Sequence, residues 1–276
     1  MDRIRLIASD MDATLLDEQS QLPADFEETI YALAELGIRF APASGRPLYT
    51  LEAMFPTLQD ELVFIGDNGG AIRWKGQNLF TSEMSPEGWR ALNRLTREQG
   101  DIAVLCGLES AYVERPFAVH DAVLRHFYTK IEYVDRLEDV AAPADKFTIY
   151  LPQHNAQQAY DTVYASQRSI YSVAVAGECW VDIMNPGVHK GAALQTLGQL
   201  WGLPSESIMA FGDTYNDAEM LRTAKYGFLM ENGSVPLRRN VPFLAPSNRE
   251  AGVMQVLHRV LAQNGCVCPE DFIPAH

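Results

Sequence analysis

The feature that most restricts the fold of this 276-residue chain is the repeated alternation of short apolar runs with amphipathic stretches. Near the N-terminus, apolar runs at 4–9, 38–43 and 62–65 predict buried strands. The spacing of apolar residues over 26–36 predicts a helix, and Gly37 suits its end. Strands that alternate with helices form a parallel sheet with helices on both faces. We therefore expect an α/β protein with a doubly wound parallel sheet.

The same alternation returns towards the C-terminus. The predicted elements there are a helix over 189–202 that ends in glycine, a strand over 207–213, a helix over 216–224 capped by Asn or Asp, short strands near 226–230 and 243–245, and a final helix near 250–263. Both ends of the chain are therefore expected to build one α/β domain.

The pattern changes between roughly residues 84 and 183. Helical stretches and strands are mixed there, and Tyr and Val concentrate in the strands, as a sheet packed on helices requires. The predicted elements are helices at 86–99, 118–128 and 155–168 and strands at 102–106, 111–115, 146–151, 171–175 and 179–184. We expect a core formed by 1–83 and 184–276, with an α+β domain of residues 84–183 inserted into it.

Composition and charge narrow the classes of partner. A hydrophobic content of 47% with 21% charged residues is ordinary for a soluble globular protein. The net charge of −14, with no basic patch, argues against nucleic-acid binding, because phosphate would be repelled. No apolar run reaches the roughly 18 residues of a membrane helix, and the N-terminal run is too short for a secretory signal. We expect a cytoplasmic protein with no nucleic-acid or membrane partner.

Polar residues follow the carboxyl ends of the predicted strands, where ligands bind in open α/β sheets. These residues are Asp10, Asp12 and Thr14, then Ser44, Gly45 and Arg46, then Asn68, and finally Gly212, Asp213, Asn216 and Asp217, with Lys190 at the start of a predicted helix. We expect them to converge at one edge of the sheet, although the first and last groups lie far apart in the sequence.

Such a set suits phosphoryl transfer. Like charges as close in the sequence as Asp10 and Asp12 are expected to repel each other, and Mg²⁺, which prefers carboxylate oxygens, would offset that repulsion. One carboxylate can attack phosphorus, and a second can protonate the leaving alcohol and later activate water. Ser44 and nearby amides can hold phosphate oxygens while Lys190 balances the developing charge. The four cysteines lack CxxC spacing, so zinc is not expected.

Four segments, in the order "DMDATLL", "ASGRP", "HKGAAL" and "GDTYNDAEML", resemble the four motifs of the haloacid dehalogenase-like (HAD) hydrolases. The long gap between the second and third segments is similar to that of the Cof-type branch, whose α/β cap domain is inserted there. The resemblance extends over almost the whole chain.

This resemblance implies a role for each acid. Asp10 would be the nucleophile and a Mg²⁺ ligand, and Asp213 would be the second metal carboxylate. Asp12 would be the general acid and base, with its backbone carbonyl on the metal. Asp217 would support the metal or Lys190.

The resemblance also implies a phosphate site. Ser44, Lys190 and Asn216 would bind phosphate through their side chains, and Met11 and Gly45 would lie against it through their backbone. Thr14 would have a supporting role. Arg46 would either contact substrate or pin a loop through a salt bridge, and Asn68 would be either a functional group or part of a tight Asn-Gly turn.

Two positions depart from the family pattern. Ala13 stands where the family usually has glycine, and a positive φ there would cost Ala roughly 1 kcal/mol. The segment "SNREAGV" (247–253) resembles a family segment that is usually richer in acids, and Arg249 within it argues against a peripheral role for that segment. Neither change removes a reacting group.

We expect a Mg²⁺-dependent phosphatase that hydrolyses small phosphorylated metabolites, such as sugar phosphates, nucleotides or phosphorylated cofactors, through an aspartyl-phosphate. The inserted domain would close over the sheet edge and select the alcohol. The alternatives are a sugar phosphomutase on the same scaffold and a non-catalytic protein that binds a phosphorylated ligand. A receiver-type signalling domain also clusters acids with a lysine, but the chain length and the insert argue against it.

Overall fold

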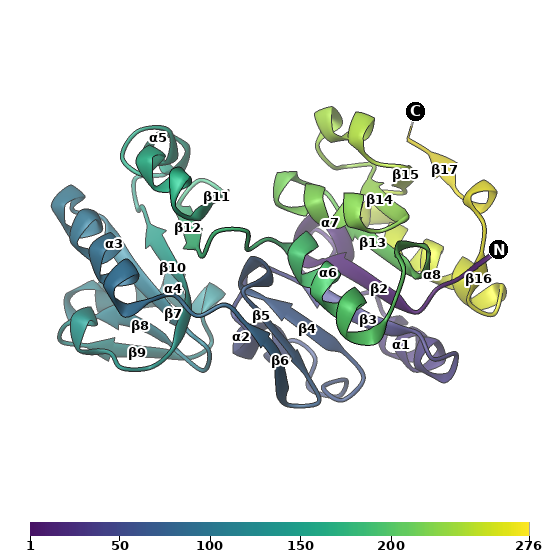
Figure 1. The fold of residues 1–276 in the computed structure, drawn as a ribbon, viewed down its shortest axis with the longest axis horizontal. Coiled ribbons are helices and arrows are strands. Elements are labelled where there is room, and N and C mark those ends of the chain that lie inside the picture. Colours follow the sequence, from purple (N-terminus) through teal and green to yellow (C-terminus); the bar gives the residue numbers. More distant parts are fainter. Residues whose placement is uncertain (276) are drawn as a thin grey trace.

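The computed structural model describes residues 1–275 and shows two lobes joined by two connecting segments (Figure 1). The larger lobe contains a nine-stranded sheet in the order β17-β15-β14-β13-β2-β3-β4-β5-β6. Its strands are β2 (Leu6–Asp10), β3 (Arg39–Ala43), β4 (Val63–Gly66), β5 (Ala71–Trp74), β6 (Gln77–Thr81), β13 (Ile208–Gly212), β14 (Tyr226–Met230), β15 (Phe243–Ala245) and β17 (Ile273–Pro274). The six strands from β15 to β4 run parallel, which confirms the predicted α/β class.

Helices cover both faces of this sheet. They are α1 (Phe26–Glu35), α2 (Leu48–Ala53), α6 (Lys190–Trp201), α7 (Ala218–Thr223) and α8 (Gly252–Ala262). Apolar residues of α1, α2 and α8 pack with Ile7 and Phe40 on one face, whereas α6 and α7 pack with Leu6 and Ala8 on the other. The strands are apolar without alternation because both of their faces are buried.

The smaller lobe is a six-stranded sheet in the order β11-β12-β10-β7-β8-β9. Its strands are β7 (Ile102–Gly107), β8 (Ala111–Glu114), β9 (Ile131–Val134), β10 (Ala144–Tyr150), β11 (Ser172–Ala176) and β12 (Trp180–Met184). Helices α3 (Pro86–Gln99) and α5 (Ala156–Asp161) pack on one face, and α4 (Asp121–Phe127) packs on the other. We call this lobe the cap.

Some predicted elements differ in the structure. The helix expected over 155–168 is α5 followed by a separate short turn at Ala165–Ser169. The chain leaves the helix because Tyr164 is fully buried and donates a hydrogen bond to Asp101 at 2.9 Å. The helix expected over 118–128 is a short turn at Arg115–His120 followed by α4.

Several strands were not predicted. The hairpin of β5 and β6 turns through Lys75 and Gly76, which both have positive φ, and continues the sheet beyond β4. Strand β9 lies at the edge of the cap sheet, and β17 lies at the edge of the large sheet. Strands β1 (Asp2–Arg3) and β16 (Cys266–Val267) form a separate pair.

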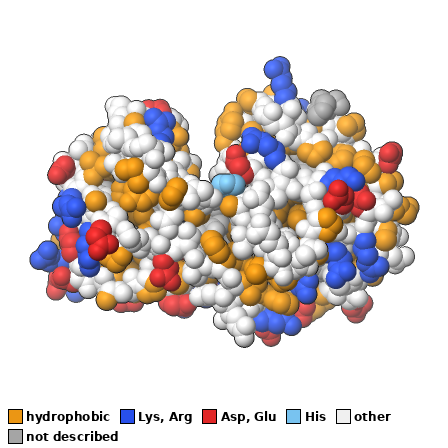
Figure 2. Space-filling model, in the orientation of Figure 1, with side chains coloured by type: hydrophobic (Ala, Val, Ile, Leu, Met, Phe, Trp, Pro, Cys, Tyr) orange, Lys and Arg blue, Asp and Glu red, His pale blue; other side chains and the backbone are white. Residues whose placement is uncertain are grey.

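The two connecting segments between the lobes run side by side. Asn185, directly after β12, donates hydrogen bonds to the carbonyl of Ser82 at 3.2 Å and to the carbonyl of Glu83 at 2.8 Å. The space-filling view shows a notch between the lobes, and on that face Lys and Arg are interspersed with Asp and Glu (Figure 2). None of the helices in residues 1–275 is both long enough and apolar enough to cross a bilayer.

Candidate active site

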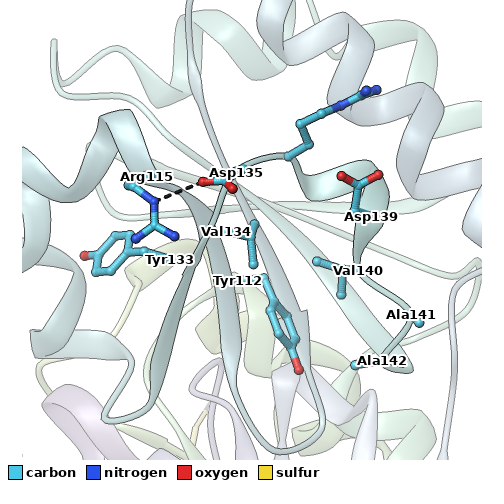
Figure 3. Close-up of a pocket in the computed structure, with 10 residues that line it drawn as sticks. Tyr112, Arg115, Tyr133, Val134, Asp135, Asp139, Val140, Ala141 and Ala142 are labelled. Atoms are coloured by element: carbon cyan, nitrogen blue, oxygen red, sulfur yellow. Dashed lines mark hydrogen bonds and ion pairs between the residues drawn. The ribbon is translucent and has the colours of Figure 1, made fainter.

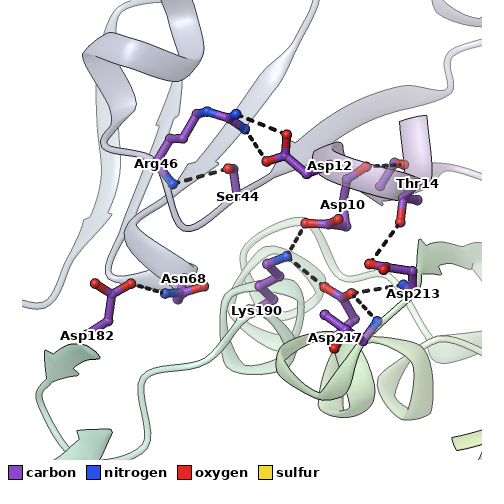
Figure 4. Close-up of polar contacts among 12 residues, drawn as sticks. Asp10, Asp12, Thr14, Ser44, Arg46, Asn68, Asp182, Lys190, Asp213 and Asp217 are labelled. Carbon is purple, nitrogen blue, oxygen red and sulfur yellow. Dashed lines mark hydrogen bonds and ion pairs between the residues drawn. The ribbon is translucent and has the colours of Figure 1, made fainter. Parts of the chain in front are cut away.

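The acids at the two ends of the chain meet because their strands are neighbours in the sheet. Asp10 is the last residue of β2, Asp213 follows β13, and these strands pair in parallel with Ser9 opposite Phe211. Asp217 approaches from the turn before α7. Carboxylate oxygens of Asp10, Asp213 and Asp217 all lie within 4.8 Å of one another (Figure 4).

Lys190 lies directly against two of these acids. It is the first residue of α6, its side chain is fully buried, and its ammonium donates a hydrogen bond to Asp10 and another to Asp217 at 2.6 Å. Burial by itself lowers the pKa of Lys190, but the charges of Asp10 and Asp217 outweigh it, and the net pKa is raised. Lys190 is therefore a fixed positive charge in the site.

One ammonium does not balance three carboxylates. Burial, and then the charge of Asp217, raise the pKa of Asp10 to about 8. Burial and Asp217 likewise raise the pKa of Asp213 to about 6. Clustered carboxylate oxygens with surplus negative charge are the donor set that a hard divalent cation prefers, so these residues fit Mg²⁺.

The turn after β13 holds Asp217 rigidly. One oxygen of Asp217 accepts hydrogen bonds from the backbone N–H groups of Asp213 at 3.0 Å and Thr214 at 3.1 Å. Gly212 makes this possible, because a Cβ at that position would lie 2.4 Å from the Cβ of Asp217. Asn216, in the same turn, has a buried Oδ1 atom with no hydrogen-bond partner among the described residues.

The loop over 11–15 carries the second acid of the first motif. Asp12 is extended and Ala13 is left-handed, with φ of 59° and ψ of 8°. The carbonyl of Ala13 accepts a hydrogen bond from Asn232 at 2.8 Å, and Thr14 donates to Asp213 at 3.4 Å. Ala13 therefore adopts a positive φ, a conformation that glycine would adopt at lower cost. Met11 is buried in the core, so only its backbone is available to a ligand.

Asp12 and Arg46 form an ion pair through two hydrogen bonds of 2.5 and 3.0 Å. The Arg46 side chain is 11% exposed and that of Asp12 is 59% exposed, so the carboxylate stands at the open side of the site. Of the two roles expected for Arg46, this contact favours the loop-pinning salt bridge.

The segment after β3 forms a loop next to Asp10. Ser44 is buried, and its Oγ atom accepts a hydrogen bond from the N–H of Arg46 at 3.1 Å. The carbonyl of Ser44 accepts from the N–H of Asn68 at 2.9 Å. Ser44, Asp12, Asp10 and Lys190 surround one space in Figure 4. We call residues 44–46 the Ser44 loop.

Three further residues reach this loop, and they were not singled out from the sequence. Lys146 and Asp182 come from cap strands β10 and β12, and Asp67 precedes Asn68. Lys146 donates to the carbonyl of Gly45 at 2.5 Å, and Asp182 accepts from the Asn68 amide at 3.0 Å. The sequence feature that could have pointed to Lys146 is the charged pair Asp145-Lys146 at the start of a mainly apolar strand.

Two hollows lie outside the cluster of Asp10, Asp213 and Asp217, although one of them is lined by Asp12. A cap cavity of about 420 Å³ lies beside Tyr112 and Tyr133, and its Arg115 and Asp135 pair with each other at 3.0 Å (Figure 3). A polar hollow of about 650 Å³ beside Asp12 includes Arg249. Arg249 pairs with Glu18, outside the acid cluster.

A sequence profile of the family described as haloacid dehalogenase-like hydrolase matches residues 7–257. The chain is 32% identical over 262 residues to the 5-amino-6-(5-phospho-D-ribitylamino)uracil phosphatase YbjI of Escherichia coli, covering 94% of this chain and 96% of the relative. It is 31% identical to the HMP-PP phosphatase of Cronobacter sakazakii, covering 87% and 89%.

Solved structures agree in fold. The structure of SMU.1108c from Streptococcus mutans superposes with a TM-score of 0.85 at 29% identity, covering 94% of this chain and 99% of the other. A haloacid dehalogenase-like hydrolase from Bacteroides thetaiotaomicron gives 0.81 at 22% identity, covering 94% and 100%, which bears on the fold alone.

Proposed function

The chain belongs to the haloacid dehalogenase-like hydrolase family and is a phosphoric monoester hydrolase, and on that premise we propose a Mg²⁺-dependent phosphatase that acts through an aspartyl-phosphate on Asp10. The observation that carries this proposal is the meeting of Asp10, Asp213 and Asp217 around Lys190. Asp10 and Asp213 lie far apart in the sequence, and their burial with Asp217 against a single ammonium leaves surplus negative charge that a bound cation would balance.

The metal would be held by Asp10 and Asp213, with the backbone carbonyl of Asp12 as a further ligand. When bound, Mg²⁺ supplies positive charge that offsets the repulsion between these carboxylates and a phosphate group. Lys190 adds a second positive charge beside Asp10, and this charge and that of the metal would both counteract the effect of burial and favour the ionised carboxylate that attack requires.

In the first step, a carboxylate oxygen of Asp10 forms a bond to phosphorus as the bond to the leaving alcohol breaks. The alcohol oxygen takes its proton from the Asp12 carboxyl group. In the second step, water attacks phosphorus, gives a proton back to Asp12, and releases the Asp10 carboxylate and inorganic phosphate. Arg46 would orient the Asp12 carboxylate through its two hydrogen bonds, and Asp12 would release one of them when it carries the transferred proton.

Ser44, the backbone of Gly45 and the Asn216 side chain would bind the phosphate oxygens. Support comes from the buried Ser44 hydroxyl, whose oxygen accepts from the N–H of Arg46 and whose hydrogen is free to donate to phosphate. Asn216 would donate through its Nδ2 group. The substrate would be a small phosphorylated metabolite, and the phosphorylated compounds named for the two relatives above are the first candidates.

The proposal is tested by phosphate release from these two compounds and from para-nitrophenyl phosphate. Release should require Mg²⁺, stop with chelator, and disappear in Asp10→Asn. Asp60→Asn, which changes an exposed aspartate of the same lobe, is the matched control and should retain full activity. In H₂¹⁸O the released phosphate should carry one ¹⁸O atom. Phosphoryl groups that reappear on a sugar with little phosphate released would instead indicate a phosphomutase, and no turnover with any substrate would refute the proposal.

A further inference from the structure

We propose that Lys146 of the cap is a positioning residue that holds the Ser44 loop in its phosphate-binding shape. This inference rests on the proposed phosphate-binding role of that loop. It differs from the expected role of a cap, which is to enclose the substrate and select its alcohol, because Lys146 contacts the loop itself. The cap would thereby set the affinity for the phosphate group, which every substrate shares.

The contacts of Lys146 cross from one lobe to the other. Its side chain is 2% exposed, and its ammonium lies 2.5 Å from the carbonyl oxygen of Gly45 and 3.0 Å from Asp67. Asp182 lies 3.7 Å away on the neighbouring cap strand. A buried charged donor on a carbonyl oxygen is a strong hydrogen bond, and it fixes the peptide plane next to Ser44.

A second contact reinforces the first. Asp182 accepts a hydrogen bond from Asn68 at 3.0 Å and another from Thr148 at 2.7 Å. Asn68 packs on the Ser44 loop, since a Cβ at Gly45 would lie 3.2 Å from its Oδ1 atom. The cap therefore holds the loop through Gly45 directly and through Asn68 indirectly.

The segment beneath these contacts is strained. Asp67, Asn68 and Gly69 have φ values of 51°, 55° and 100°. Asp and Asn tolerate positive φ better than other non-glycine residues, but two of them in succession still carry a conformational cost. A Cβ on Gly69 would lie 2.6 Å from the carbonyl oxygen of His189, directly before Lys190. The segment thus touches both the Ser44 loop and the start of α6, and its conformation needs external contacts to persist.

Strand β10 is shaped to deliver Lys146. Its register shifts between Ala144 and Lys146, which inserts an extra residue, Asp145. Such a bulge re-aims side chains, and here Asp145 and Lys146 both meet the strained segment, Asp145 lying 3.0 Å from where a Cβ of Gly70 would be. Alternation in a regular strand would have sent them to opposite faces.

The ionisable groups around Lys146 come from both lobes. They are Asp67 and Tyr49 of the core and Asp145, Asp182, Cys106 and Tyr128 of the cap. Burial and the charge of Asp67 raise the pKa of Asp145 well above its ordinary value. The ammonium of Lys146 lies nearest to Asp67 and Asp182, and its removal leaves Asp67 buried without this cation.

The test must separate loop positioning from plain stability. We would compare Lys146→Met with the double variant Lys146→Met/Asp67→Asn, in which the uncompensated carboxylate is also removed. Arg94→Met, which removes an exposed cation from α3 of the cap, is the matched control. The readouts are the melting temperature, the affinity for vanadate with Mg²⁺, KM and kcat for para-nitrophenyl phosphate, and amide exchange over 44–46 and 67–69.

We expect Lys146→Met to weaken vanadate binding and raise KM by about tenfold, the effect of losing one hydrogen bond to a charged group. Exchange over 44–46 and 67–69 should accelerate, and Arg94→Met should change nothing. The double variant should recover melting temperature but not vanadate affinity. Recovery of both, or unchanged affinity in a folded Lys146→Met, would overturn the proposal.

Failure of the proposed function would look different. If the wild-type protein neither binds vanadate nor releases phosphate, the phosphatase proposal fails on its own. Amide exchange still tests Lys146 in that case. Faster exchange over 44–46 in Lys146→Met supports its hold on the loop, and unchanged exchange refutes it.

Discussion

Replacing Ala13 with glycine should stabilise this protein, although glycine usually has the opposite effect. Ala13 has a φ of 59°, and its side chain is exposed, so little buried surface is lost with the methyl group. A left-handed conformation costs an L-residue roughly 1–2 kcal/mol, which glycine does not incur. Glycine in turn gives the unfolded chain about 0.4–1 kcal/mol of extra conformational entropy.

The difference between these terms favours the variant by about 0.5–1 kcal/mol. For a chain of this size, that free energy raises the melting temperature by roughly 1–4 °C. The carbonyl of Ala13 keeps its hydrogen bond from Asn232, so the loop should keep its path and phosphate release should remain close to the wild-type rate.

The assay is thermal unfolding of the variant beside a matched replacement, Ala91→Gly. Ala91 is exposed inside α3, where ordinary helical geometry applies, and glycine there should cost about 1 kcal/mol. The two alanine-to-glycine changes should therefore shift the melting temperature in opposite directions. A fall in Ala13→Gly equal to that in Ala91→Gly would refute the reasoning from backbone conformation.

Three further predictions concern the site and the connection between the lobes. Beryllium fluoride should raise the melting temperature only when Mg²⁺ is present, and a rise without Mg²⁺ would contradict the assigned metal ligands. Arg46→Ala should lower kcat by about ten- to hundredfold with KM nearly unchanged, because the Asp12 carboxylate loses the two hydrogen bonds that orient it. A rise in KM alone would instead show that Arg46 contacts substrate. Asn185→Ala should destabilise the protein by about 1–3 kcal/mol in urea unfolding, since Asn185 of one connecting segment donates hydrogen bonds to Ser82 and Glu83 of the other. Unchanged stability would show that these bonds contribute little.

The predicted strand-end residues illustrate what local pattern can reveal. Asp10 and Asp213 were expected to meet because each follows a short apolar run, and parallel strands place such ends at one sheet edge. The structure brings them within reach of each other and of Lys190. This prediction needed only the order of elements, which sequence periodicity indicates, and the right-handed connection that parallel strands adopt in general.

The choice between two roles for Arg46 could not be made in this way. Both roles place the same residue at the same strand end, and they differ only in the direction of a long, flexible side chain. The carboxylate of Asp12, carried by a loop from another strand, decides that direction. The same limit applies to Lys146, whose charge is visible in the sequence but whose partner belongs to the other lobe.

The order and spacing of residues alone determined the α/β class, and they also led us to expect an insertion between its halves and a group of acids with Lys190, because these depend on periodicity and on which residues end each strand. Only the tertiary structure decided that Ala13 is left-handed, that Asp12 turns to Arg46 and that cap residues hold the Ser44 loop. Those features depend on contacts between segments distant in the chain, and such contacts acquire a geometry only when the two lobes pack together.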